Sequence, residues 1–310
     1  MRLVQRSVLP GFNITMGFTI TYLCLIVIIP LSGLFIVTSG VSFAEMKEIM
    51  SNLIVKRAFY LTFRSSFIAA CVNAIFGFIV AWSLIRYRFI GRRFIDAMVD
   101  LPFALPTSVS GIALARIYSD SGWLGRGFTE DGCVTRLFHS FGSFLSSTGL
   151  PCFVDWGEKI LACPAFPIRN TEVGITLALI FIGLPFVIRT LQPAIEEIDR
   201  ETEEAAASLG ASRWKTFWRV LFPALLPAHI SGFAMAFARA LGEYGTVIFI
   251  GGSLPGKTQT ISYVIYEKAE ENNLVAASVV AVVALLISFA LLLLINLIQV
   301  WANRRYARTD

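Results

Sequence analysis

Charged residues are scarce in this chain of 310 residues, because Asp, Glu, Lys and Arg make up only 15% of it and apolar residues make up 56%. Ordinary soluble domains contain about 25% charged residues, so the composition excludes a soluble globular protein. Histidine is scarcer still, with two in the chain, and the sequence suggests no association of a nucleophile with a base and an orienting group. We therefore predict no catalytic residues, and interpret His229 as a loop or interface residue.

Long apolar runs take the place of the missing charge. Six of them reach the length of about 20 residues that a helix needs to cross the hydrocarbon core of a bilayer. They cover residues 13–38, 59–85, 96–118, 171–191, 225–252 and 276–301. The sequence predicts an all-α polytopic membrane protein with about six transmembrane helices, built as a single domain over residues 1–310.

The first run follows Arg2 and Arg6, as a signal peptide would, but it is too long and lacks a clear small-residue cleavage site. We interpret it as a retained helix. Lys and Arg are densest in the short loops that share a side with the N-terminus, such as RYRFIGRR at 86–93, and this bias predicts that both termini are cytoplasmic. The net charge of +5 then follows from membrane topology, and it indicates no nucleic-acid partner.

Residues 251–258 read GGSLPGKT and fit the phosphate-binding pattern G-x-x-x-x-G-K-[ST]. A true loop of this kind follows a buried strand, opens a helix and has a downstream acid for magnesium. Here the preceding apolar run is about 28 residues long, too long for one strand, and the last apolar run has no acid. We interpret GGSLPGKT as a Gly/Pro turn where a helix leaves the membrane on the outer side.

Residues 199–223 form the longest charged stretch on the predicted cytoplasmic side. Asp199 and the acids after it suit a helix N-terminus, Gly210 can end that helix in a left-handed conformation, and Ser212 can cap a second short helix. An aromatic face follows at helical spacing, made of Trp214, Phe217, Trp218 and Leu221. Either a partner docks on this projection, or the segment lies on the membrane surface with its tryptophans among the headgroups.

The stretch EAAASLGASRWKTFWRVLFP resembles the signature E-A-A-x3-G-x9-I-x-L-P of permease subunits in ATP-binding cassette (ABC) importers. Its identical positions are Glu204, Ala205, Ala206, Gly210 and Pro223, whereas Val220 and Phe222 replace the Ile and Leu. The resemblance implies the type I importer permease fold and a coupling loop that inserts into a groove of a separate ATPase subunit. Nucleotide is then bound by that partner, and this chain has no cofactor and is not itself an enzyme.

Three further stretches, residues 100–125, 237–252 and 285–299, are similar to the permease T subunits of sulfate/thiosulfate importers. This resemblance implies a subunit of the bacterial inner membrane, surrounded by lipid, that carries sulfate or thiosulfate from periplasm to cytoplasm. Its implied partners are an ATPase dimer, a second permease subunit in a heterodimer, and a periplasmic sulfate/thiosulfate-binding protein. Molybdate/tungstate permeases have similar segments and are the alternative. A secondary oxyanion carrier would leave the coupling signature without a purpose.

Four residues inside the predicted spans are candidates for an anion pathway. Thr107 and Ser108 follow Pro106, which interrupts helical hydrogen bonding, and irregular backbone at membrane depth is tolerated where it lines a cavity. Arg239 and Glu243 stand four residues apart on one helix face, and ionisable residues in a bilayer often mark a transport path. The alternatives are a kinked packing helix for the first pair and an ion pair that holds helices together for the second.

Residues 128–166 form a polar external loop with three of the five cysteines, Cys133, Cys152 and Cys163. In an oxidising compartment this number permits one disulfide and leaves one free thiol, and spacing does not give the connectivity. Together with His139 the cysteines match no common zinc pattern, so we predict no metal site. Two alternatives stay open for these cysteines, one disulfide or no covalent role.

Overall fold

The computed structural model describes residues 12–128 and 168–306, together with a few residues between 132 and 143. The described chain is all-helical, as the sequence predicts. The predicted external loop at 128–166 falls almost wholly outside the described residues. Within it Cys133 is an exposed free thiol, and Cys152, Cys163 and His139 are not described.

Within the described residues, five helices are long and apolar enough to cross a membrane by length and composition. These candidate spans are Ile14–Ser39, Leu53–Arg86, Glu172–Glu196, Arg213–Leu241 and Leu274–Val300. The elements that make them up are α1 (Phe12–Leu23), η1 (Cys24–Ile28), α2 (Ile29–Ser39), α4 (Leu53–Arg86), α10 (Glu172–Glu196), α12 (Arg213–Thr216), η3 (Phe217–Leu221), α13 (Phe222–Leu241) and α16 (Leu274–Tyr306).

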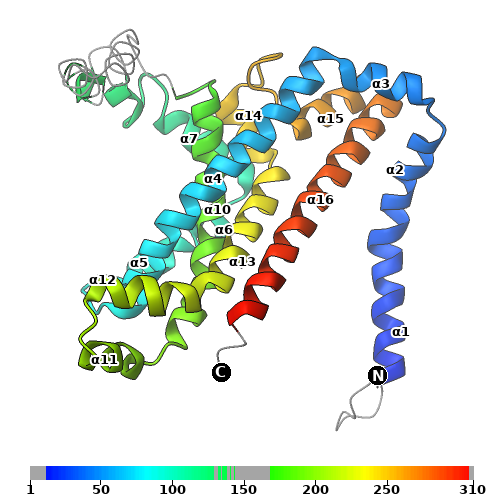
Figure 1. The fold of residues 1–310 in the computed structure, drawn as a ribbon. Coiled ribbons are helices and arrows are strands. Elements are labelled where there is room, and N and C mark those ends of the chain that lie inside the picture. The colour runs from blue at the N-terminus through cyan, green and yellow to red at the C-terminus, as the bar shows by residue number, and fades with distance from the viewer. Residues whose placement is uncertain are drawn as a thin grey trace.

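The remaining elements are shorter. They are α3 (Phe43–Ser51), α5 (Arg92–Val99), α6 (Leu101–Ala104), α7 (Thr107–Ile117), η2 (Gly125–Phe128), α11 (Arg200–Ser208), α14 (Gly245–Gly251) and α15 (Ile261–Glu270). Figure 1 shows α11 and α12 at one end of the molecule, which we call the lower end. The first described helix, α1, begins at this end, and the last, α16, finishes there. The opposite, upper end carries α3, α14 and α15.

The third predicted span is not one helix, which corrects the prediction for residues 96–118. Three short helices, α5, α6 and α7, take the chain from the lower to the upper end (Figure 1). Pro102 lies in the first turn of α6, and Leu105 before Pro106 is extended, with φ −89° and ψ 135°. Proline disfavours the helical conformation in the residue that precedes it, so Pro106 ends α6 and starts α7.

The fifth predicted span, residues 225–252, is also divided. α13 ends at Leu241 and α14 begins at Gly245, so Glu243 lies in the break and not inside a continuous helix. At its other end α13 is continuous with η3 and α12 as a single helical run from Arg213. The second helix of the predicted coupling loop therefore continues directly into a candidate membrane span.

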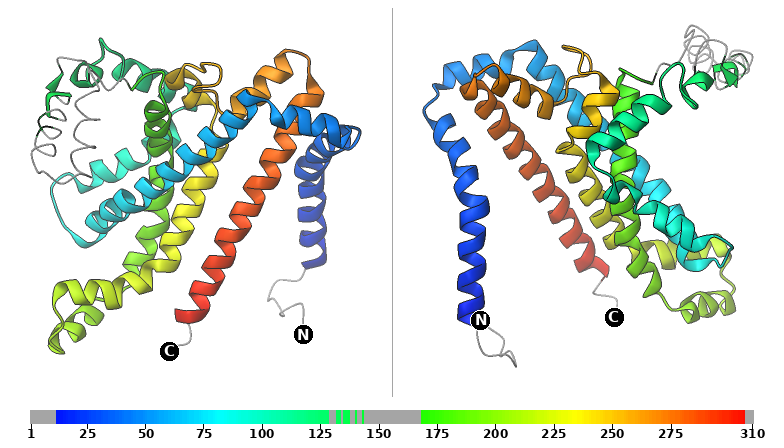
Figure 2. Two further views of the ribbon diagram at one scale, coloured as in Figure 1. Left: turned by 45° about the horizontal axis from the view of Figure 1, so that its top comes forward. Right: turned by 180° about the vertical axis from the view of Figure 1, so that it is seen from behind.

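The core is formed by α4, α10 and α13, which contact one another pairwise. Glycines at the crossings let the backbones approach closely, as in many membrane bundles. A Cβ at Gly77 of α4 would lie 2.8 Å from a methyl group of Val187, and one at Gly232 of α13 would lie 3.2 Å from the Val187 Cα atom. By contrast, α1 and α2 bury none of the residues in their apolar window, and Figure 2 shows them standing apart from this bundle.

Candidate functional site

The first candidate site is the lower-end projection made of α11 and the turn after it. Asp199 is the N-cap residue, although its side chain makes no capping bond, and Glu201 and Glu203 lie in the first turn, where carboxylates favour the helix dipole. Gly210 has φ +78°. Its N–H donates to Ala207 O at 2.9 Å, and Ala211 N donates to Ala206 O at 3.0 Å, which is the Schellman pattern of helix ends. The predicted glycine stop is confirmed.

The second helix of the projection starts as predicted. The Ser212 Oγ accepts from Lys215 N at 3.4 Å and caps α12. Trp214, Phe217, Trp218 and Phe222 form a continuous ring cluster, with centroid distances from 4.9 Å for Trp218–Phe222 to 6.2 Å for Trp214–Phe217. Trp214 is 71% exposed, so the outer part of this aromatic cluster is free to contact lipid or a partner.

Arg86, the last residue of α4, fastens the projection to the bundle. Its Nη2 donates to Ile198 O at 2.9 Å and lies 3.2 Å from Glu203 Oε1, and its guanidinium lies 5.4 Å from the Trp82 ring centroid. The Arg86–Glu203 contact has ion-pair distance without hydrogen-bond geometry. The Arg86 side chain is only 12% exposed, so this nearly buried arginine joins α4, the segment after α10 and α11.

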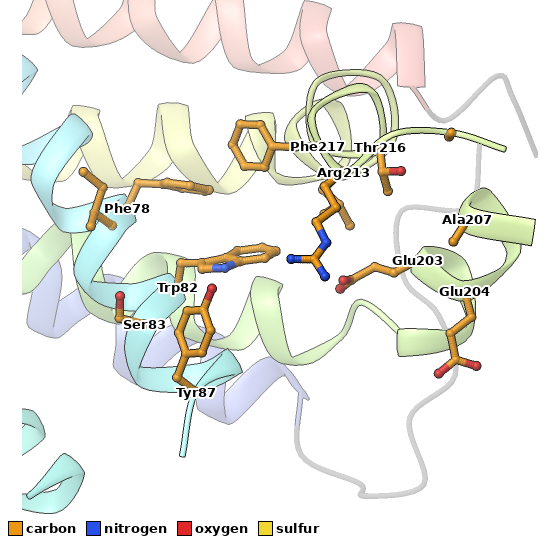
Figure 3. Close-up of a pocket in the computed structure, with 13 residues that line it drawn as sticks. Phe78, Trp82, Ser83, Tyr87, Glu203, Glu204, Ala207, Arg213, Thr216 and Phe217 are labelled. Atoms are coloured by element: carbon orange, nitrogen blue, oxygen red, sulfur yellow. The ribbon is translucent and has the colours of Figure 1, made fainter. Parts of the chain in front are cut away.

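A cavity of about 740 Å³ lies between α4, α11 and α12 (Figure 3). In Figure 3 the side chains of Glu203 and Arg213 point toward each other beside Trp82, whereas the Glu204 carboxylate points away from them. The cavity is lined by Phe78, Ile79, Trp82, Ser83, Tyr87, Glu203, Glu204, Ala207, Ala211, Arg213, Thr216, Phe217 and Leu221. It lies between α11 and α4, which meet at the Arg86–Glu203 contact, so α11 projects from the bundle.

The structure brings most of the predicted loop residues together. Glu204, Ala205 and Ala206 lie on α11 next to the Gly210 turn, and Leu209 beside them is 88% exposed. Pro223 lies apart from them, in the first turn of α13. Figure 1 shows that the helical run bends between α12 and α13. The π-helical η3 lies between them, and α13 carries Pro223 and Pro227 in its first two turns. Proline and π-turns are common causes of helix kinks.

The second candidate site lies at the break between α13 and α14. The Arg239 Nη1 atom donates to Glu243 Oε2 at 2.6 Å, as the spacing predicts. The other carboxylate oxygen accepts from Thr246 N at 2.9 Å, and the Thr246 hydroxyl donates to Thr107 O at 3.0 Å. Glu243 is buried, whereas the Arg239 side chain is 33% exposed. One carboxylate thus holds the arginine and also caps the start of α14.

Thr107 and its neighbours pack directly against the backbone at the start of α14. A Cβ at Gly245 would lie 2.3 Å from Thr107 Oγ1 and 3.2 Å from Ser108 N, and a Cβ at Gly111 would lie 2.8 Å from Thr246 Cα. The four predicted pathway residues therefore belong to one cluster, in which Thr107 and Glu243 are bridged by Thr246. Ser108 is exposed beside it.

Sequence reasoning missed three parts of these sites. Arg86 was considered only as part of the basic loop 86–93 and Arg189 was not singled out, yet each is a cross-helix anchor. Arg189 Nε donates to Asp100 Oδ1 and its Nη1 donates to Asp96 Oδ1, both at 2.8 Å, which ties α10 to α5. Thr246 was not singled out. The four-residue spacing of Trp82 and Arg86 was the one local signal for a buried arginine there.

The fold and the loop define a class of protein. The family described as "Binding-protein-dependent transport system inner membrane component" matches residues 73–308, and the chain belongs to this family of multi-pass inner-membrane proteins. The sulfate transport system permease protein CysT of Escherichia coli (strain K12) is 39% identical over 97% of each chain. The protein of the same name from Synechocystis sp. is 39% identical over 93% of this chain and 89% of its own.

Solved structures share the fold at low sequence identity. A bacterial ABC transporter involved in the import of the acidic polysaccharide alginate superposes with a TM-score of 0.65 and 16% identity, over 93% of this chain and 94% of that chain. A chain of the MetNI methionine ABC transporter in an inward-facing form has a TM-score of 0.52 and 15% identity, over 80% of this chain and 96% of that chain. These two likenesses support the arrangement of helices alone.

Proposed function

We propose that this chain is a permease subunit that moves sulfate or thiosulfate from the periplasm to the cytoplasm as part of an ABC importer. The relatives that are 39% identical over nearly the full length are named sulfate permeases, and this is the observation that supports the substrate. The projection of α11 and α12 supports the energy source, because an exposed helix joined to the bundle mainly through Arg86 suits docking into another subunit. ATP is bound and hydrolysed by a dimer of such partner subunits.

The proposed orientation places the lower end in the cytoplasm, with both termini there. Figure 1 has the start of α1, the end of α16 and the α11–α12 projection at the same end, and an ATPase reaches the projection only from the side that holds ATP. In a background without the five native cysteines, Leu209→Cys should resist an impermeant thiol reagent in intact cells, and Leu254→Cys should react. The opposite labelling would reverse the orientation.

The proposed assembly contains a second permease subunit, in a heterodimer, and a periplasmic binding protein that delivers the anion. Within this chain Arg239 contacts the transported anion. Its side chain is one-third exposed and uses one N–H group on Glu243, while an arginine has five N–H donors. An oxyanion competes with Glu243 for the same positive charge, and Thr107 and Ser108 lie at the neighbouring break.

Uptake of labelled sulfate into proteoliposomes that contain the complete complex tests this function. We expect uptake that needs both ATP and the binding protein, with competition by thiosulfate stronger than competition by molybdate. Stronger competition by molybdate would favour the alternative molybdate/tungstate permease. Uptake by this chain in the absence of the ATPase subunits would favour a secondary carrier instead.

A further inference from the structure

A second cavity lies at the upper end, away from both candidate sites. It has a volume of about 480 Å³ and lies between the start of α4, the turn before α10 and the loop that follows α14. It is lined by Arg57, Tyr60, Leu61, Asn170, Thr171, Glu172, Gly256, Lys257 and Thr258. The loop is the segment GGSLPGKT, whose role the transport function does not explain.

This loop has a fixed conformation, but it is not a nucleotide loop. A helix, α14, precedes it where a phosphate-binding loop has a strand, and the next helix starts only at Ile261. The Thr258 Oγ1 accepts from Leu254 N at 2.9 Å, and Thr258 N donates to Leu254 O at 3.0 Å. Gly252 and Gly256 have φ of +67° and +66°. These features close a tight turn that fixes the backbone of Lys257 at the cavity.

Arg57 is fixed against the same turn. Its Nη1 donates to Gly256 O at 3.3 Å, and a Cβ at Gly256 would lie 3.3 Å from that nitrogen. Because Gly256 also has a positive φ, glycine suits this position both for its conformation and for the close approach of the guanidinium. The arginine and the lysine therefore line one cavity from two separate elements, α4 and the turn.

The charges around the cavity do not cancel. Among the lining residues Glu172 is the one acid, and it pairs with Arg64 at 3.1 Å. Neither Arg57 nor Lys257 has a carboxylate partner within the described part of the chain. Two cations without a carboxylate partner in a concave site suit a small anion, and an arginine fork beside a lysine suits a tetrahedral oxyanion with several acceptor oxygens.

We propose that the cavity between Arg57 and Lys257 is an oxyanion-binding site on the outer face, where sulfate binds before it enters the membrane path. This inference rests on the proposed function for the identity of the anion and for the orientation. The concave shape favours a small ion over an acidic side chain presented by the surface of a docking protein.

The test measures how sulfate protects Lys257 from acylation. The complex, in lipid nanodiscs and without binding protein, is treated briefly with an amine-reactive reagent, and mass spectrometry gives the rate at each lysine. We expect sulfate, against chloride at equal ionic strength, to slow Lys257 about tenfold at roughly ten times its dissociation constant. Exposed Lys56, one residue from Arg57, is the internal control and should not change. Arg57→Gln should abolish the protection, and Arg57→Lys should restore part of it.

Equal slowing at Lys56 and Lys257 would show ionic screening only and overturn the site. Protection that needs the binding protein would show a protein-docking surface and also overturn it. If sulfate fails but another tetrahedral oxyanion protects Lys257, the site stands and the proposed substrate is wrong. If no oxyanion protects Lys257 while proteoliposomes of the same preparation import sulfate, the site is wrong and the proposed function stands.

Discussion

Arg86 and Arg239 lie toward opposite ends of the bundle of α4, α10 and α13, and they use the same side chain differently. Arg86 is almost buried and holds a backbone carbonyl, a carboxylate and an aromatic ring from three segments. Arg239 is one-third exposed and holds one carboxylate. The comparison shows that the role of an arginine in a membrane protein follows from its partners and its exposure. Arg86 has the contacts of a structural anchor, and Arg239 keeps N–H donors that a ligand can use.

The largest expected effect is at Arg239. Arg239→Met should abolish sulfate transport, because even a modestly screened charge pair at about 4 Å is worth about 4 kcal/mol at an effective dielectric of 20. Arg239→Lys should keep part of the activity, since the charge remains and the planar fork is lost. Uptake in proteoliposomes is the measurement. The matched control is Lys268→Met, which breaks a surface ion pair with Glu271. Normal uptake by Arg239→Met would show that Arg239, like Arg86, is a structural anchor.

Exchanging Arg239 and Glu243 does not separate these roles. Glu243 also accepts from Thr246 N and caps α14, so an arginine at position 243 removes this cap even if the ion pair forms again. A loss of transport in the exchanged protein would therefore follow from either role, and single substitutions at Arg239 are the sharper test.

Arg86→Gln should have the next largest effect and a different character. The substitution removes the charged hydrogen bond to Ile198 O, the ion pair with Glu203 and the contact with the Trp82 ring. It should weaken the attachment of α11 to the bundle by about 2 kcal/mol. Glu203→Gln should cost less than about 1 kcal/mol, because Glu203 is more than one-third exposed. We expect the sulfate moved per ATP hydrolysed to fall, while the ATPase still assembles. A double-mutant cycle gives the coupling of the pair, and unchanged stoichiometry in Arg86→Gln would contradict the fastening role.

Gly210 offers a smaller and purely conformational test of the same projection. A Cβ there would meet no atom within 4 Å, so a substitution acts through the positive φ alone. Gly210→Ala should cost about 1–2 kcal/mol in the end of α11, and Gly210→Val should cost more because it is β-branched. Gly210→Asn is the matched variant that tolerates this conformation. Co-purification of the ATPase with the permease should fall in the order Gly, Asn, Ala, Val, and equal recovery from all four would exclude a docking role for the turn.

The smallest effect is expected at Thr246. Thr246→Val removes the hydroxyl bond to Thr107 O and should lower the stability of the complex by about 1 kcal/mol, whereas Thr246→Ser keeps the donor. Thermal unfolding of the purified complex distinguishes the two variants. If Val and Ser behave alike, this hydroxyl bond does not stabilise the contact between α7 and α14.

Short-range sequence patterns predicted the features of this structure that depend on residues close together in the chain. Gly210, the Ser212 cap and the Arg239–Glu243 pair depend on residues at most five apart, so spacing and backbone preference define them. The roles of Glu204, Ala205, Ala206 and Pro223 in coupling come from resemblance and stay predictions. Hydropathy found the apolar runs but joined α5 to α7 and α13 to α14, because averaging over a window does not register an extended residue such as Leu105.

Long-range contacts were not accessible in the same way. Arg86 bonds to Ile198, and Arg189 bonds to Asp96 and Asp100, across 112, 93 and 89 positions of the chain. No periodicity relates such residues, since the contacts arise only after the helices have packed. The same holds for Arg57 and Gly256, which are 199 positions apart.

The unbroken run from Arg213 to Leu241 has a mechanical consequence, because it bends between α12 and α13 (Figure 1). In a bent helix of this kind, turning the lower segment, α12, rotates the upper segment, α13, about the axis of α13. The Arg239 head group lies about 6 Å from that axis, judged by the outer radius of a helix. A turn of about 10° would therefore sweep it by about 1 Å, enough to take a hydrogen bond of normal length out of its range. Torque applied through α12 would then move the Arg239 head group relative to the neighbouring helices, without any change in the length of the span.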